Sequence, residues 1–203
     1  MIGDILCEIV KFISGVNARW FCDPCGKTQR VYFANHSSHL DAFVLWAALP
    51  PKIRHQTRVV AAKDYWEETR LRRLISHKIY NPLLIERSCH ISHDNANHPI
   101  NQMAQVLDKD QSIVIFPEGT RNEEGKVQPF KSGLYYISKK RPQVELIPVY
   151  LENLNRILPK GEILFVPLIG SVTFGKAISF DPNENKEAFL ERARKAIKDL
   201  EGV

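Results

Sequence analysis

The chain has 203 residues, 44% of them hydrophobic and 25% charged, which is typical of a folded globular protein and argues against an intrinsically disordered one. This length allows one substantial domain with a full hydrophobic core and is short for two. The net charge of +5 suggests an anionic partner such as a phosphate-bearing substrate, an anionic membrane or a nucleic acid. Because the basic residues are dispersed and accompany no recognition motif, we expect no nucleic-acid partner.

The first predicted element is an amphipathic helix over residues 2–13, which has apolar residues on one face and Asp4, Glu8 and Lys11 on the other. Such a helix packs on the protein's own core or lies in a membrane interface, and the pattern leaves both open. We assign residues 1–21 to this amphipathic N-terminal segment. Acidic residues interrupt it, so a signal peptide is not expected, and no apolar stretch reaches the length of a membrane span. We therefore expect a cytoplasmic protein.

Strand-like runs and helical patterns alternate along the rest of the chain. The predicted strands are 30–34, 57–62, 82–86, 111–116, 144–150, 163–167 and 171–174. The predicted helices are about 39–49, 64–78, 98–108, 131–140 and 184–201. This alternation predicts the α/β class, with one domain over residues 1–203 built on a mixed, largely parallel sheet flanked by helices.

Two groups of potential metal ligands occur in the sequence. Cys22 and Cys25 form a C-x-x-C pair, but no second pair follows at zinc-ribbon spacing. The stretch SCHISHDNANH, residues 88–98, contains three His and one Asp without a known ligand spacing. We interpret the cysteines as reduced thiols and the stretch as a solvated loop, and we predict no metal site.

The first polar cluster, NHSSHLD at residues 35–41, follows the predicted strand 30–34. Ser38 to Asp41 reads S-x-x-D, which is a capping-box pattern at a helix N-terminus. His36 and Asp41 are also a base and a carboxylate, and such a pair can take a proton from an alcohol. Residues five apart in an ideal helix point about 140° away from each other, so His36 must precede the helix and Asp41 must lie in its first turn. The capping and catalytic interpretations are compatible.

The second polar cluster, PEGTR, follows the predicted strand 111–116, and active sites of parallel sheets lie beyond the carboxyl ends of the strands. Gly119 allows backbone N–H groups to approach a ligand closely, Thr120 offers a hydroxyl, and Arg121 offers a bidentate fork suited to phosphate. Lys131 opens the next predicted helix, whose N-terminus favours an anion. The alternative is an ordinary polar turn with a surface ion pair between Glu118 and Arg121.

Four motifs in this order resemble those of the glycerophospholipid acyltransferase family, whose best-known members are 1-acylglycerol-3-phosphate acyltransferases. They are N-H-x4-D at 35–41, LLIERS at 83–88, FPEGTR at 116–121 and LIPVYL at 146–151. The similarity covers roughly residues 30–178. In the second motif, Asn81 and Leu84 stand where the family usually has Gly and Phe.

The resemblance implies that Asp41 orients the His36 ring, that His36 takes the proton from a glycerol hydroxyl, and that this oxygen attacks an acyl thioester directly. It implies an acceptor phosphate held by Arg87, Arg121 and Lys131, with Gly119 and Thr120 beside it and Glu118 positioning the acceptor or the arginine. No cofactor is expected, because acyl-CoA or acyl-carrier protein serves as the co-substrate.

The expected partners are thus a lysophospholipid acceptor, a thioester donor and a membrane surface. Many relatives carry N-terminal membrane-spanning segments, whereas this chain shows the amphipathic helix and aromatic groups near basic residues at 19–21 and 65–73. We therefore expect peripheral membrane association. The alternatives are an acyltransferase or transacylase for another lysolipid, and a non-catalytic lipid-binding protein on the same fold.

Overall fold

The computed structural model describes residues 16–26, 29–38, 40–69, 82–86, 95–122, 126–152 and 170–203. The helix predicted over 2–13, the strand predicted over 163–167 and Arg87 lie outside these residues.

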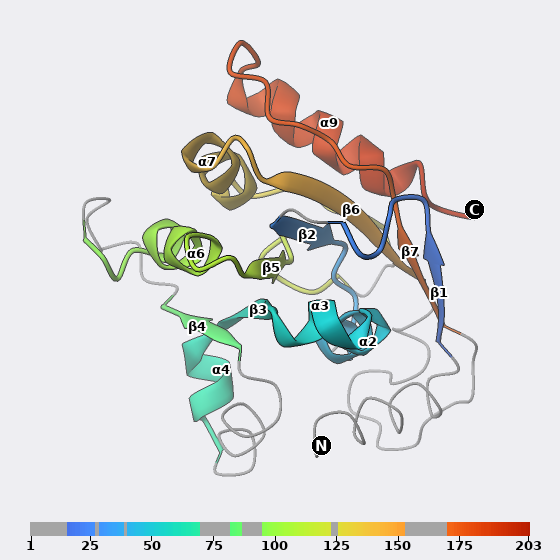
Figure 1. Cartoon of the computed structure of the whole chain (residues 1–203), viewed down its shortest axis with the longest axis horizontal. Helices are drawn as coiled ribbons and strands as arrows, with labels where there is room; N and C mark the ends of the chain where they lie inside the picture. Colours follow the sequence, from blue (N-terminus) through green and yellow to red (C-terminus); the bar gives the residue numbers. More distant parts are fainter. Residues whose placement is uncertain are drawn as a thin grey trace.

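A seven-stranded sheet in the order β1-β7-β6-β2-β5-β3-β4 runs through the middle of the molecule (Figure 1). The strands are β1 (Asn17–Trp20), β2 (Arg30–Ala34), β3 (Thr57–Ala62), β4 (Leu83–Ile85), β5 (Ser112–Ile115), β6 (Glu145–Glu152) and β7 (Ser171–Phe174). Neighbouring strands are parallel, except that β7 is antiparallel to β6. The predicted mixed, largely parallel sheet is confirmed.

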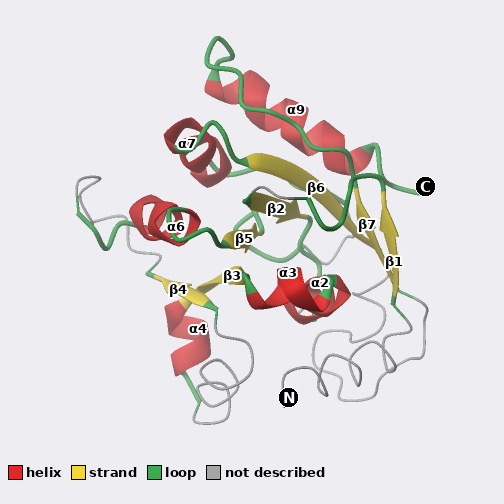
Figure 2. Ribbon diagram, viewed as in Figure 1, coloured by secondary structure: helices red, strands yellow, loops and turns green. Residues whose placement is uncertain are grey.

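Helices cover both faces of this sheet (Figure 2). They are α2 (Asp41–Ala48), α3 (Pro51–His55), α4 (Lys63–Glu67), α6 (Pro99–Leu107), α7 (Gly133–Lys140) and α9 (Lys186–Lys198). α2, α3 and α4 lie on one face, and α6, α7 and α9 lie on the other.

The central strands are apolar on both faces because each face has a helical layer to pack against. Along β2, Val31 and Phe33 contribute to the core under α6, α7 and α9, whereas Tyr32 and Ala34 contribute to the core under α2. All five residues of β2 are buried, including Arg30, which pairs with Glu145 at 2.9 Å. The candidate site therefore follows β2, a buried strand that is paired on both edges and packed on both faces.

The structure corrects the predictions made from the sequence at three places. Residues 17–20 form the edge strand β1, so the amphipathic N-terminal segment predicted over 1–21 does not extend to residue 21. α3 was not predicted, and it begins at Pro51, whose fixed φ suits the first position of a helix. Trp66, predicted to be an interfacial aromatic, is only 8% exposed and belongs to the core.

Trp20, the last residue of β1, stacks its ring on Phe174 of β7, with the ring centroids 3.6 Å apart. Phe21, the next residue, is 46% exposed. In the part of the chain that the structure describes, no helix combines the length and the apolar character that a bilayer crossing requires.

Candidate active site

The polar segment that follows β2 forms the centre of the site. In the sheet β2 lies between β5 and β6, with Phe33 opposite Ile115 of β5 and Ala34 opposite Val149 of β6. Residues 35–38 therefore leave the sheet at the carboxyl edge shared by three parallel strands. Ligand sites of α/β sheets lie at this edge.

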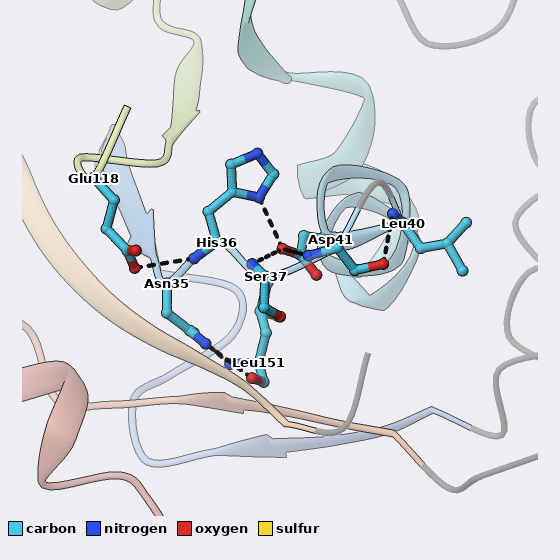
Figure 3. Close-up of polar contacts among 8 residues, drawn as sticks. Asn35, His36, Ser37, Leu40, Asp41, Glu118 and Leu151 are labelled. Carbon is cyan, nitrogen blue, oxygen red and sulfur yellow. Dashed lines mark hydrogen bonds and ion pairs between the residues drawn. The ribbon is translucent and has the colours of Figure 1, made fainter. Parts of the chain in front are cut away.

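His36 and Asp41 face one another across this segment. His36 Nδ1 lies 2.8 Å from Asp41 Oδ2; the carboxylate is fully buried, whereas the imidazole is 21% exposed. An ionised carboxylate only accepts hydrogen bonds, so Nδ1 carries the proton and Nε2 keeps its lone pair. Figure 3 shows Nε2 directed away from the labelled neighbours. The predicted geometry is confirmed, because His36 precedes α2 and Asp41 is its first residue.

The main chain between the two residues holds the carboxylate in place. The N–H groups of Ser37 and Ser38 donate to the same Asp41 Oδ2, at 2.6 and 2.8 Å. The predicted capping box is present only in its carboxylate half: Leu40 occupies the N-cap position, and the Ser38 hydroxyl accepts from the Leu40 N–H. Asp41 therefore stabilises the start of α2 and orients His36 with one oxygen atom.

Asn35 anchors the start of the segment to a neighbouring strand. Its side-chain amide donates to the Leu151 carbonyl at 2.9 Å, and its side-chain oxygen accepts from the Leu151 N–H at 2.7 Å. Asn35 is 4% exposed, so both bonds are shielded from water. This reciprocal pair ties the end of β2 to β6 beside His36 (Figure 3). Sequence analysis did not identify Asn35 as a site residue.

The PEGTR segment lies directly against His36. The ring of Phe116 stacks on the imidazole with the centroids 4.3 Å apart and the planes 25° apart. The His36 N–H donates to Glu118 Oε1 at 3.1 Å, and the His36 carbonyl accepts from the Asn122 N–H at 2.8 Å. The two polar clusters predicted to share one edge of the sheet are therefore in contact, and the main chain of His36 is held on both sides.

Glu118 is buried, with 4% of its surface exposed, so a surface ion pair with Arg121 does not describe it. Burial raises the pKa of Glu118 to about 7, and the charge of Asp41 acts in the same direction. The backbone N–H groups of His36 and Gln128 and the charge of Arg194 lower this pKa without cancelling the effect of burial. Glu118 Oε1 accepts the hydrogen bond from the main-chain N–H of His36, and the sequence did not indicate this contact.

Gly119 occupies the point of the turn where only a glycine fits. Its φ of +73° lies in the left-handed region, and a Cβ atom there would lie 2.8 Å from Nζ and two carbons of the Lys131 side chain. The Lys131 N–H donates to the Pro117 carbonyl at 2.8 Å. The ammonium group of Lys131 therefore lies over the turn.

The remaining predicted residues have different placements. Thr120 and Arg121 are exposed at the end of the same turn, next to Asn122. Arg87 and His39 lie outside the described residues. The structure therefore brings His36, Asp41, Glu118, Gly119 and Lys131 into one site, with Arg121 on its rim.

The described residues include no group of three or more His, Cys, Asp or Glu side chains that would hold a metal ion. Burial raises the pKa of the Cys22 thiol, and Cys22 and Cys25 are both free cysteines. His98, from the proposed solvated loop, serves as the N-cap of α6, where its Nδ1 accepts from the Ile100 N–H.

A histidine with Nδ1 bound to a buried carboxylate and Nε2 directed outward has the arrangement of a general base, here at the carboxyl edge of an α/β sheet. Comparison with known proteins identifies the family. The Acyltransferase family model matches residues 19–152, and the chain belongs to this family.

Two curated relatives extend the match along the chain. The 1-acyl-sn-glycerol-3-phosphate acyltransferase of Limnanthes douglasii is 25% identical over 189 residues, which cover 88% of this chain and 60% of that protein. The protein of the same name from Cocos nucifera is 24% identical over 165 residues, covering 79% of this chain and 49% of that protein. This chain thus spans 49–60% of the length of these two relatives.

Among solved structures, the 1-acyl-sn-glycerophosphate (LPA) acyltransferase PlsC from Thermotoga maritima has the same fold. The TM-score is 0.69 at 18% identity, and the match covers 98% of this chain and 81% of that one.

Proposed function

We propose that this protein is an O-acyltransferase that moves a fatty acyl group from a thioester donor to the free hydroxyl of 1-acylglycerol-3-phosphate, giving phosphatidic acid. The observation that carries the proposal is the His36–Asp41 pair, with 2.8 Å between Nδ1 and Oδ2 and with Nε2 directed away from the carboxylate. The names of the Limnanthes and Cocos relatives support this choice of acceptor.

In this reaction His36 Nε2 takes the proton of the acceptor hydroxyl as its oxygen attacks the thioester carbonyl. The buried Asp41 carboxylate stabilises the imidazolium that forms. Collapse of the tetrahedral intermediate breaks the carbon–sulfur bond, and the leaving thiolate receives the proton from His36. The imidazole is then neutral again, the acyl group is esterified to the acceptor, and no covalent acyl-enzyme is required.

The phosphate of the acceptor is assigned to Arg121 and Lys131, with Arg87 as a third cation. Arg121 is exposed at the end of the turn that contacts His36, and Lys131 lies over Gly119 of the same turn. A phosphate held there would keep the glycerol hydroxyl within reach of Nε2. The donor is acyl-CoA or acyl-carrier protein, no cofactor takes part, and the protein works at the surface of a membrane.

The direct test is acyl transfer by the purified chain, measured as thiol release and as lipid product. Palmitoyl-CoA and palmitoyl-acyl-carrier protein serve as donors, and the acceptors are a panel of lysophospholipids. His36→Ala is expected to reduce kcat by about a hundred- to ten-thousandfold, because a positioned base contributes that much. His55→Ala is the matched control, since His55 ends α3 before β3 begins and thus lies at the opposite edge of the sheet. Wild-type turnover by a folded His36→Ala protein would refute the proposal.

The acceptor assignment has its own test. Arg121→Ala is expected to raise the KM for 1-acylglycerol-3-phosphate more than the KM for the donor, and Arg121→Lys should restore it only in part. With a monoacylglycerol, which lacks the phosphate, the Ala variant and the wild type should behave alike. Lys176→Ala removes the same charge at the opposite edge and serves as the control, because Lys176 follows β7. Equal effects on both substrates would assign Arg121 to the donor instead.

A further inference from the structure

An aromatic ring covers one face of the His36 imidazole. The rings of Phe116 and His36 stack with their centroids 4.3 Å apart and their planes 25° apart. The hydrogen bond from Nδ1 to Asp41 is made in the plane of the imidazole, whereas the contact with Phe116 is made across that plane. The imidazole therefore has two neighbours of different chemistry, a carboxylate at its edge and an aromatic ring at its face.

The sheet places the ring of Phe116 on the same side as the imidazole. Side chains alternate between the two faces along a strand, and in β5 Val114 packs in the core under α2 whereas Ile115 packs in the core on the opposite face. Phe116, the next residue, continues this alternation and packs against the core under α2. Because β5 and β2 are parallel neighbours, a residue just beyond β5 lies close to the segment that follows β2 and carries His36. The fold thus holds the aromatic ring against the imidazole by packing.

The face of an aromatic ring attracts a cation that lies within about 6 Å of its centroid. In the proposed reaction the His36 ring is neutral before proton transfer and carries a positive charge after it. The attraction between the two rings is therefore stronger in the transition state than in the ground state, and only such a difference accelerates the chemical step. An attraction of this kind corresponds to a factor of about two to thirty in rate.

We propose that Phe116 acts through His36 as a positioning residue: its ring holds the imidazole at one face and stabilises the imidazolium. This inference rests on the proposed function, because the transfer of a proton to Nε2 is the step that charges the ring. Asp41 acts at Nδ1 in the plane of the imidazole and Phe116 acts across that plane, so their contributions are separate.

The test replaces Phe116 with phenylalanines that carry one, two or three fluorine atoms on the ring, introduced by suppression of an amber codon. Fluorine withdraws electron density from the ring face and adds little volume, so it weakens the attraction to a cation and leaves the packing in place. The same series at Phe174 is the matched control, because Phe174 also stacks face to face, on Trp20, and neither ring takes part in the proposed reaction. Phe116→Leu removes the ring altogether. Urea unfolding of each variant sets conditions in which all are folded.

The rate constant for thiol release in a single turnover is expected to fall with each fluorine added at Phe116, by about two- to thirtyfold with three fluorines. Phe116→Leu should lower it at least as far. The acceptor concentration that gives half of the maximal rate should change less than about twofold, because Arg121 and Lys131, which are assigned to the phosphate, are untouched. The same rate constant throughout the Phe116 series, or an equal decrease in the Phe174 series, would overturn the proposal.

A second measurement does not depend on acyl transfer. Diethyl pyrocarbonate carbethoxylates histidine at a ring nitrogen, and attack by Nε2 of His36 on this reagent also places a positive charge on the ring. The rate at His36 is the difference between each protein and its His36→Gln counterpart, and it should fall across the Phe116 series and stay constant across the Phe174 series. If the wild type transferred no acyl group and this rate still fell in the Phe116 series alone, the inference would hold and the proposed function would fail. A rate of carbethoxylation unchanged by fluorine at Phe116 would refute the inference itself.

Discussion

Replacing Asp41 with asparagine separates the orienting role of the carboxylate from its charge. Asp41 Oδ2 accepts three hydrogen bonds, from His36 Nδ1 and from the N–H groups of Ser37 and Ser38. An amide NH2 group in that place would face three donors, so the amide oxygen of the variant must occupy it. The ring would then keep its proton on Nδ1, and Nε2 would stay available. What Asp41→Asn removes is the negative charge beside the imidazolium.

The size of the effect follows from the kind of hydrogen bond that is lost. A bond to a charged group contributes about 1.5–3 kcal/mol and a neutral one about 0.5–1.5 kcal/mol, so the difference is about 1–2 kcal/mol. At about 1.4 kcal/mol for each factor of ten, kcat should fall about five- to thirtyfold. Asp41→Ala leaves two main-chain donors without an acceptor, each at about 1–3 kcal/mol, so it should also destabilise the fold by about 2–6 kcal/mol.

The assay is the initial rate of thiol release at saturating substrates, with urea unfolding of each variant measured in parallel. The expected order of kcat is wild type, Asp41→Asn, Asp41→Ala and His36→Ala. If Asp41→Asn were folded and as inactive as His36→Ala, the proton on the ring would have moved to Nε2, contrary to this reasoning. If it were fully active, the charge of the carboxylate would have no part in catalysis.

Three further predictions concern the groups around this pair. Because the pKa of Glu118 is raised to about 7 in the folded protein, its protonated form contributes stability below about pH 4.5 that is lost as the pH rises to 7. Between pH 5 and pH 8, the free energy of unfolding measured in urea should therefore decrease less in Glu118→Gln than in the wild type. The difference between the two decreases should be up to about 3 kcal/mol. Gly119→Ala should lower the melting temperature and raise the acceptor KM, because its φ of +73° disfavours Ala and the new methyl group displaces the Lys131 ammonium. Asn35→Ala leaves the N–H and the carbonyl of Leu151 without their hydrogen-bond partners. Urea unfolding should therefore show a free energy of unfolding lower by about 2–6 kcal/mol.

The sequence was sufficient to predict the features that depend on short separations. His36 and Asp41 are five residues apart at a junction between a strand and a helix, so their pairing follows from local geometry. The approach of PEGTR to NHSSHLD follows from a general rule, because both segments end parallel strands. That these strands are direct neighbours is a property of the sheet order, which the sequence pattern does not contain.

The features that were missed depend on long-range register or on burial. The bonds of Asn35 to Leu151 and of Arg194 to Val127 join residues 116 and 67 positions apart, and no local pattern marks either partner. β1 alternates polar and apolar side chains over only four residues, which is too short a run to predict a strand, and its pairing with β7 makes it one. Trp66 has basic neighbours in sequence, but its ring is buried in the fold.

The contacts around His36 divide by the length of chain that each one closes. The bond to Asp41 closes a loop of five residues, which costs little chain entropy and can form with the first turn of α2. The bond of the His36 N–H to Glu118 spans 82 residues, and the bond of Asn35 to Leu151 spans 116, so both must wait until the sheet is assembled. During folding, the hydrogen bond between His36 and Asp41 would therefore form early, and the contacts that orient the main chain around His36 would form late. Partly folded molecules would hold a complete acid–base pair that is not yet aimed at a substrate.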